Sequence, residues 1–272
     1  LKGDTEEAFH AYEACLQICR DEPYLFEENF TILQVVYTNY LFSCLIDRRN
    51  DAFLETLEAL RQIPVRHPDD QLSMEINLTQ QELLFSMNTA DFARGQKLVP
   101  RLSELIRKRQ LPAGRYLGFY FNLAILHFLD GRYSDANKWM RELLYEPRAE
   151  SRRDLQFVVW IMQLPVHYEL GNQLLLKDLI RAGKRRHKTI GVAQEYFSKV
   201  FDFFGKLERS PYHVADFEPA QPFYDDLVTM LEDPNTRNPP GIMELRCWLQ
   251  SHLEKRPISA IFTEHANAAS EK

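Results

Sequence analysis

Apolar residues recur every three or four positions along most of the chain, which is the spacing of one buried face of an α-helix. Prolines and short polar turns divide this pattern into segments, and no segment shows the strict alternation typical of a strand. The sequence therefore predicts an all-α fold. The predicted helices span residues 5–20, 25–46, 52–63, 70–87, 90–109, 114–129, 134–145, 152–169, 173–187, 190–207, 222–232 and 240–254.

Up to about residue 187 these helices come in pairs, and the pairs repeat. The residues that follow the turn inside each pair are Phe53, Phe92, Tyr133 and Gln173, which are separated by 39, 41 and 40 residues. The stretches that begin at His127 and His167 also align, exactly one repeat apart. Two helices per period of about 40 residues predict an α-solenoid of paired antiparallel helices.

The unit from residue 120 to residue 147 carries a family pattern. The positions that carry this pattern are Tyr120, Leu123, Ala124, His127, Gly131, Tyr133, Ala136, Met140 and Pro147. This unit resembles the tetratricopeptide repeat, in which small residues let the two helices of a pair approach closely. The resemblance extends over about residues 1–187 and implies a divergent tetratricopeptide-like protein.

We expect two regions, a repeat array over 1–207 and a C-terminal region over 208–272. The second region contains seven prolines and two amphipathic stretches that we expect to cap the last repeat, while 264–272 resembles a disordered tail. Because the chain opens without methionine and with what resembles half a repeat, we interpret it as a fragment. The face carrying Ala8, Tyr12 and Leu16 would then be partly uncovered and open to self-association.

No catalytic motif stands out, and we predict neither enzyme activity nor a cofactor. The chain has no Gly-x-Ser-x-Gly, no phosphate-binding glycine loop and no His-Glu-x-x-His. His127 and His167 hold equivalent places in adjacent repeats, but no cysteine or carboxylate recurs with them. A helix–helix contact is therefore preferred over a metal bridge between repeats.

Charge is distributed unevenly around a net value of -6. Residues 1–70 carry a net charge of -8, residues 148–188 a net charge of +5 and residues 210–272 a net charge of -5. The basic cluster comprises Arg181, Lys184, Arg185 and Arg186, followed by Lys188. Its place at a helix C-terminus suits the helix dipole, and contact with the acidic C-terminal tail or with an acidic partner is the second interpretation. The acidic chain and the lack of interleaved aromatic residues argue against nucleic acid.

The resemblance implies a concave groove lined by the first helix of each pair. The groove-facing positions would include Phe121, Asn122, Ile125, Phe128, Ile161 and Tyr168, a mainly apolar and aromatic set. Such a lining predicts a non-catalytic scaffold that binds a peptide or helical segment of a protein partner. The chain's own C-terminal region is an alternative occupant of the groove.

Two other classes of function remain open at this stage. One is a regulatory part of a larger protein linked to nucleic acid or signalling through a preceding domain, and the other is an unrecognised enzyme. No apolar run reaches the length of a membrane span, so no membrane contact is predicted. Four cysteines in so long a chain do not indicate a disulfide framework, and we expect a reducing, cytoplasmic compartment.

Overall fold

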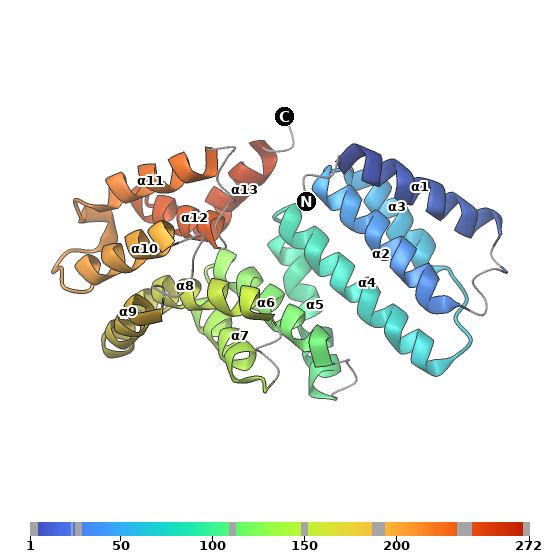
Figure 1. The fold of residues 1–272 in the computed structure, drawn as a ribbon, viewed down its shortest axis with the longest axis horizontal. Coiled ribbons are helices and arrows are strands. Elements are labelled where there is room, and N and C mark those ends of the chain that lie inside the picture. Colours follow the sequence, from blue (N-terminus) through green and yellow to red (C-terminus); the bar gives the residue numbers. More distant parts are fainter. Residues whose placement is uncertain are drawn as a thin grey trace. The chain divides into compact units, whose positions relative to one another are not determined.

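The computed structural model describes residues 5–22, 24, 29–108, 113–147, 152–186, 194–232 and 241–268. These residues form helices and no strand, so the predicted all-α fold is confirmed. The chain forms two compact units, one within Leu1–Leu111 and the other within Pro112–Ala269. In each unit, helices that follow one another in sequence pack side by side (Figure 1).

The first unit contains five helices. They are α1 (Thr5–Asp21), α2 (Phe30–Ile46), α3 (Asn50–Arg61), α4 (Pro68–Asn88) and α5 (Phe92–Arg107). Aromatic rings join the helices of its core: Phe9 of α1 lies 5.2 Å from Tyr40 of α2 between ring centroids, and Phe53 of α3 stacks on Phe85 of α4 at 4.7 Å. Burial of these rings is the main stabilisation that such short helices have.

The second unit begins with two helix pairs and continues with the C-terminal helices. Its elements are α6 (Ala113–Leu129), α7 (Tyr133–Tyr145), α8 (Arg153–Glu169), α9 (Gln173–Arg186), α10 (Gln194–Leu207), the 3-10 turn η4 (Val214–Asp216), α11 (Ala220–Glu232), α12 (Ile242–Leu253) and α13 (Ile258–Ala268). Ala124 and Ala136 are fully buried in α6 and α7, which pack closely against each other.

The predicted helices match the structure to within a few residues, with one omission and one error at the C-terminus. Helix α13 was not predicted, and residues 264–268, expected to be disordered, form its second half. Ile258 and Ile261 are buried and give α13 an apolar face that packs against α6 and α12. Residues 269–272 of the predicted tail, and residues 25–28 and 190–193 of two predicted helices, lie outside the described part of the chain.

Four helix pairs turn in the same way. The chain takes a positive φ at Arg48, Ala90, Gly131 and Gly171, each just after the first helix of its pair. These positions are 42, 41 and 40 residues apart. A left-handed residue ends a helix by bonding its last carbonyl groups, and only glycine adopts this conformation without a steric cost. Arg48 and Ala90 therefore carry a backbone strain that Gly131 and Gly171 do not.

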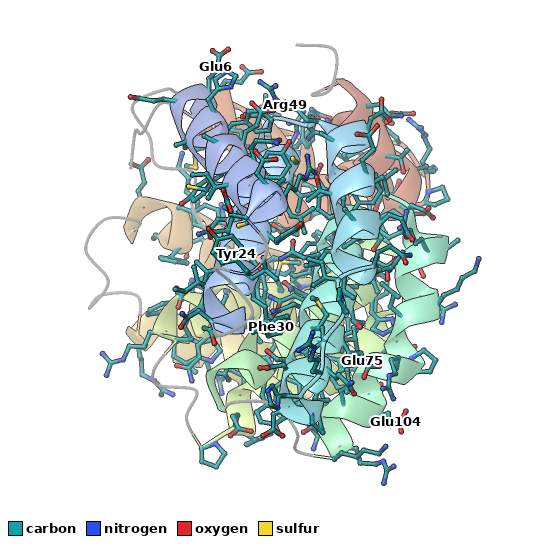
Figure 2. All side chains as sticks on the ribbon, turned by 90° about the vertical axis from the view of Figure 1, so that its right-hand side faces the viewer. Glu6, Tyr24, Phe30, Arg49, Glu75 and Glu104 are labelled. Atoms are coloured by element: carbon teal, nitrogen blue, oxygen red, sulfur yellow. The ribbon has the colours of Figure 1, made fainter. Side chains whose placement is uncertain are left out.

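The face of α1 that is open to solvent differs from the predicted one. Leu16 is 2% exposed and belongs to the core of the first unit, and Tyr12 packs partly against that core. Of the three residues predicted to be uncovered, only Ala8 is exposed. Leu16 lies on the side of α1 that packs into the core of the first unit, next to α2 (Figure 2). The exposed apolar residues of α1, such as Ile18, lie on the opposite side of the helix.

Candidate functional site

The predicted groove is not open in the structure. Ile125, Phe128 and Ile161 are 2%, 0% and 1% exposed, Asn122 is 9% exposed, and Phe121 is half-buried. Helices α12 and α13 pack on α6, and α12 also packs on α8. These C-terminal helices thus cover the face that the repeat pattern assigns to a partner, as the alternative interpretation had it.

Tyr168 of α8 contacts two elements of the C-terminal region that packs over the predicted groove. Its hydroxyl oxygen accepts a hydrogen bond from the backbone N–H of Val214 at 3.0 Å, and its ring lies edge-on to Trp248 at 5.8 Å between centroids. At Gly241, a side chain would meet Val158 and Ile161, because an added Cβ would lie 3.4 Å from Val158 Cγ1. Tyr168 and Ile161 therefore have neighbours from the chain's own C-terminal region and contribute to its packing.

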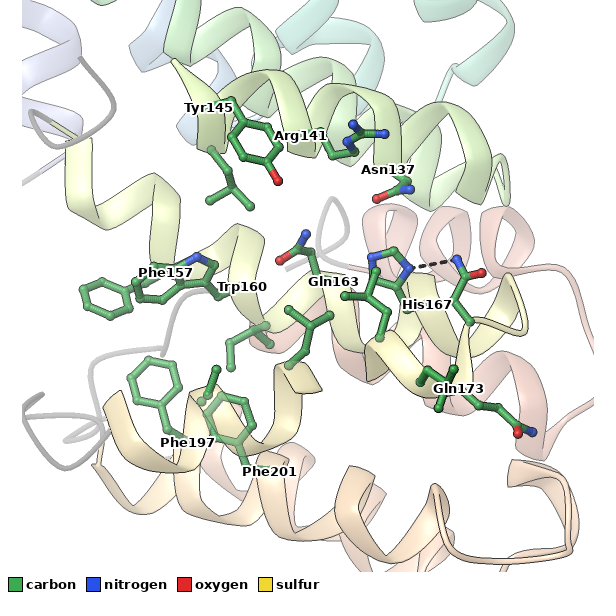
Figure 3. A pocket seen from close by; sticks show the side chains of 18 of the residues that line it. Asn137, Arg141, Tyr145, Phe157, Trp160, Gln163, His167, Gln173, Phe197 and Phe201 are labelled. Atoms are coloured by element: carbon green, nitrogen blue, oxygen red, sulfur yellow. Dashed lines mark hydrogen bonds between the residues drawn. The ribbon is translucent and has the colours of Figure 1, made fainter. Parts of the chain in front are cut away.

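A different face of α8 lines a cavity of about 1120 Å³. Figure 3 shows Asn137, Arg141 and Tyr145 of α7 on one side, Phe197 and Phe201 of α10 on the other, and α8 between them. Leu175, Leu179, Ala182 and Gly183 of α9 complete the wall. On α8 the lining residues are Phe157, Trp160, Ile161, Gln163 and His167. Apart from Ile161, these residues lie on a different side of α8 from the groove positions that the repeat pattern implies.

Aromatic and aliphatic groups form most of the cavity wall. The rings of Phe157 and Trp160 meet edge-to-face at 5.3 Å, and Phe157 lies 6.2 Å from Phe197. Tyr145 and Leu174 at the rim are 78% and 83% exposed. Because they lie beside an apolar cavity, these two exposed side chains make the rim a candidate contact surface.

Amide groups are the notable polar feature of the cavity. Gln163 is only 7% exposed, yet its side chain makes no hydrogen bond with any residue that the structure describes. Figure 3 shows its amide directed into the space between α8 and α7. Across that space, Asn137 Oδ1 is buried and likewise lacks a partner among the described residues. A buried oxygen without a partner, such as Asn137 Oδ1, costs about 1–3 kcal/mol, which a ligand that donates a hydrogen bond to it would recover.

His167 closes the polar side of the cavity. Burial lowers the pKa of its imidazole. The side-chain N–H of Asn172 donates to His167 Nδ1 at 3.1 Å, which leaves the proton of the neutral ring on Nε2 (Figure 3). Burial also lowers the pKa of His127 in the preceding repeat. Among the described residues, no group of three or more His, Cys, Asp or Glu side chains could hold a metal ion.

The basic cluster of α9 adjoins this cavity. Arg185 is exposed, Arg181 lies 3.9 Å from Asp178, and Lys184 Nζ donates to Asp202 of α10 at 2.5 Å. The Arg186 side chain lies outside the described part of the structure. Helix α9 thus presents Leu179, Ala182 and Gly183 to the cavity and its cations to the neighbouring surface. Apart from Ile161, the cavity residues were not predicted as a site, since only the packing of four helices brings them together.

Compared with family models, curated proteins and solved structures, the chain matches none of them. Among the described helices, none is long and apolar enough to cross a membrane.

Proposed function

We propose that the chain is a non-catalytic interaction module built from tetratricopeptide-like repeats, and that it binds an extended peptide segment of another protein in the cavity between α7, α8, α9 and α10. The repeated left-handed turns at intervals of 40 to 42 residues support the repeat assignment. A cytoplasmic location stays a prediction from the sequence. The proposal moves the binding site from the predicted groove to the cavity.

The unpartnered amide of Gln163 carries the proposal. A primary amide both donates and accepts hydrogen bonds, so Gln163 and Asn137 are matched to the N–H and C=O groups of a peptide backbone. A bound helix has already paired its own backbone groups, whereas an extended segment presents them. The two amides therefore favour an extended segment over a helix.

The cavity wall defines the side chains that such a segment needs. The rings of Phe157, Trp160 and Phe197 suit a large apolar or aromatic side chain, which would displace water from them. Arg141 at the cavity and Arg185 nearby favour acidic residues beside that anchor. The expected ligand is an extended segment with a large apolar anchor and flanking carboxylates.

The test is selection from a displayed library of random peptides, with wild-type protein as the target, followed by titration of synthetic peptides by fluorescence anisotropy. The Gln163→Leu variant should bind the selected peptides about tenfold or more weakly, because it removes the amide but keeps the bulk. Methylation of the peptide N–H that pairs with the amide should cause a comparable loss. Added salt should have a smaller effect than either change.

Gln156→Leu is the matched control, since Gln156 lies on the same helix and does not line the cavity. Its affinity should equal that of the wild type. If no peptide is enriched, or if the two glutamine variants bind equally well, the cavity is not a peptide site. Binding that is steeply salt-dependent and lost on charge reversal at Arg181 and Arg185 would assign the site to the basic cluster instead.

A further inference from the structure

The polar end of the cavity contains a buried imidazole nitrogen without a partner. His167 is 2% exposed, and the Asn172 amide occupies its Nδ1, so Nε2 is left for another partner. No described residue bonds to that nitrogen, and Figure 3 shows it facing the same space as the Gln163 amide. A buried donor of this kind gains most from an acceptor that a ligand supplies.

Arg141 adds a positive charge on the opposite side of that space (Figure 3). It belongs to the cavity wall on α7, and its guanidinium forms no ion pair with any residue that the structure describes. The described lining residues include no Asp or Glu. The wall therefore combines one cation with the neutral donors of His167 and Gln163, and it has no anion beside them. Such a set of donors suits a carboxylate, which accepts hydrogen bonds at both oxygens.

Few other ionisable groups reach the His167 ring. Helices α6, α7, α9 and α12 pack on α8, and of these only α7 brings described charged or ionisable side chains, Arg141 and Tyr145, to the cavity wall. Helix α10 adds only phenylalanine there, and His252 of α12 contacts Glu169, which does not line the cavity. Burial alone lowers the pKa of His167, so the neutral ring predominates at about pH 7 in the ligand-free chain.

We propose that His167 and Arg141 hold a side-chain carboxylate of the bound segment, and that binding takes up a proton at His167. The proposal rests on the proposed function, since the carboxylate belongs to the same extended segment as the apolar anchor. Phe157 and Trp160 precede His167 by ten and seven residues, or about 15 and 10 Å along α8. An extended segment rises about 3.3 Å per residue, so its Asp or Glu should lie three or four residues from the anchor.

Proton uptake makes binding depend on pH. A carboxylate beside Nε2 raises the pKa of the His167 ring in the complex, because an opposite charge favours the protonated form. Affinity should therefore rise as the pH falls from about 8 to about 6, where the complex binds more protons than the free chain. The gain is lost at about pH 4, where the carboxylate of the ligand is itself protonated.

Isothermal titration calorimetry with a selected peptide tests the proposal. The peptide is acetylated and amidated, so that side chains carry its only carboxylates. Its affinity should rise about fivefold or more between about pH 8 and about pH 6, and buffers of different ionisation enthalpy should show proton uptake on binding. An analogue with the side-chain carboxylate replaced by its amide should bind about tenfold more weakly at about pH 6 and lose the pH dependence.

His167→Gln keeps a donor but cannot take up the proton, so its affinity should not change with pH. His127→Gln is the matched control, because His127 is buried at the equivalent place in the preceding repeat and does not line the cavity. It should keep the pH dependence of the wild type, and circular dichroism should show that both variants are folded at each pH. The peptide analogue tests the same coupling without any change to the protein.

Three results would overturn the proposal and leave the peptide site in place. They are wild-type binding that does not vary with pH, equal pH dependence in the two histidine variants, and binding that requires a free peptide terminus. A library that yields no peptide at all would overturn the proposed function and this proposal together.

Discussion

The indole N–H of Trp248 donates a hydrogen bond to Glu169 Oε1 over 2.7 Å, joining α12 to the last turn of α8 across 79 residues of sequence. The same oxygen lies 2.5 Å from His252 Nε2, one turn further along α12. Trp248 is fully buried and stacks on Phe204 of α10 at 5.5 Å. One carboxylate oxygen of α8 thus pairs with both Trp248 and His252, and these two contacts hold α12 over the predicted groove.

Removal of this carboxylate should weaken the second unit. Glu169→Leu leaves the buried Trp248 N–H without an acceptor and should lower the free energy of unfolding by about 1–3 kcal/mol. Urea denaturation followed by circular dichroism measures it, with Glu232→Leu at an exposed helix end as the control. In a Trp248→Phe background, which lacks the donor, the loss should be smaller. An equal loss in both backgrounds would show that the hydrogen bond contributes nothing.

The close approach of α9 and α10 requires glycine at position 183. A Cβ added to Gly183 would lie 2.0 Å from Phe201 Cε1, so Gly183→Ala forces the ring to move and should cost about 1–3 kcal/mol. At Gly118 in α6 an added Cβ meets nothing within 4 Å, and Gly118→Ala should be neutral or stabilising by up to about 1 kcal/mol. Thermal denaturation compares the two variants. Similar melting temperatures would contradict the packing described for α9 and α10.

The left-handed turns predict opposite effects at two equivalent positions. Ala90 has a φ of 56°, which is strained for a residue with a side chain, so Ala90→Gly should stabilise the protein by about 0.5–1 kcal/mol. Gly131 has a φ of 72°, and an added Cβ would make only an ordinary contact with Ile258 at 3.9 Å. Gly131→Ala should therefore destabilise the protein by about 1 kcal/mol through the backbone alone. Chemical denaturation measures both, and effects of the same sign would refute the shared turn.

Stability should fall on acidification. Burial lowers the pKa of His167 in the folded state, so below the unfolded value of about 6.5 the unfolded chain binds more protons than the folded chain. The contribution of the neutral ring is complete above that pH and is lost as the pH falls. His167→Gln should reduce the difference in unfolding free energy between about pH 7 and about pH 5. The exposed His213 provides the control, and an equal reduction in His213→Gln would exclude this explanation.

Local sequence determined the helices and their turns. Buried residues such as Leu123, Ala124 and Ala136 lie at helical spacing, and the turns at Gly131 and Gly171 use a residue type that favours the left-handed conformation. These signals depend on neighbours a few residues away, so periodicity and turn chemistry are sufficient to read them. Helix α13 was missed because its second half, residues 264–268, carries no large apolar side chain, and packing of Ile258 and Ile261 stabilises it.

The composition of the candidate site depends on contacts between helices that are distant in sequence, and no local sequence pattern predicts these contacts. Nothing near Gln163 in the sequence shows whether its amide has a partner, because its surroundings come from α7, α9 and α10. Likewise, Tyr168 resembles a groove residue until α12 and η4 are placed beside it. The sequence thus determined which residues are helical and apolar. Only tertiary packing decided which apolar faces are covered by the chain itself and which remain open to a partner.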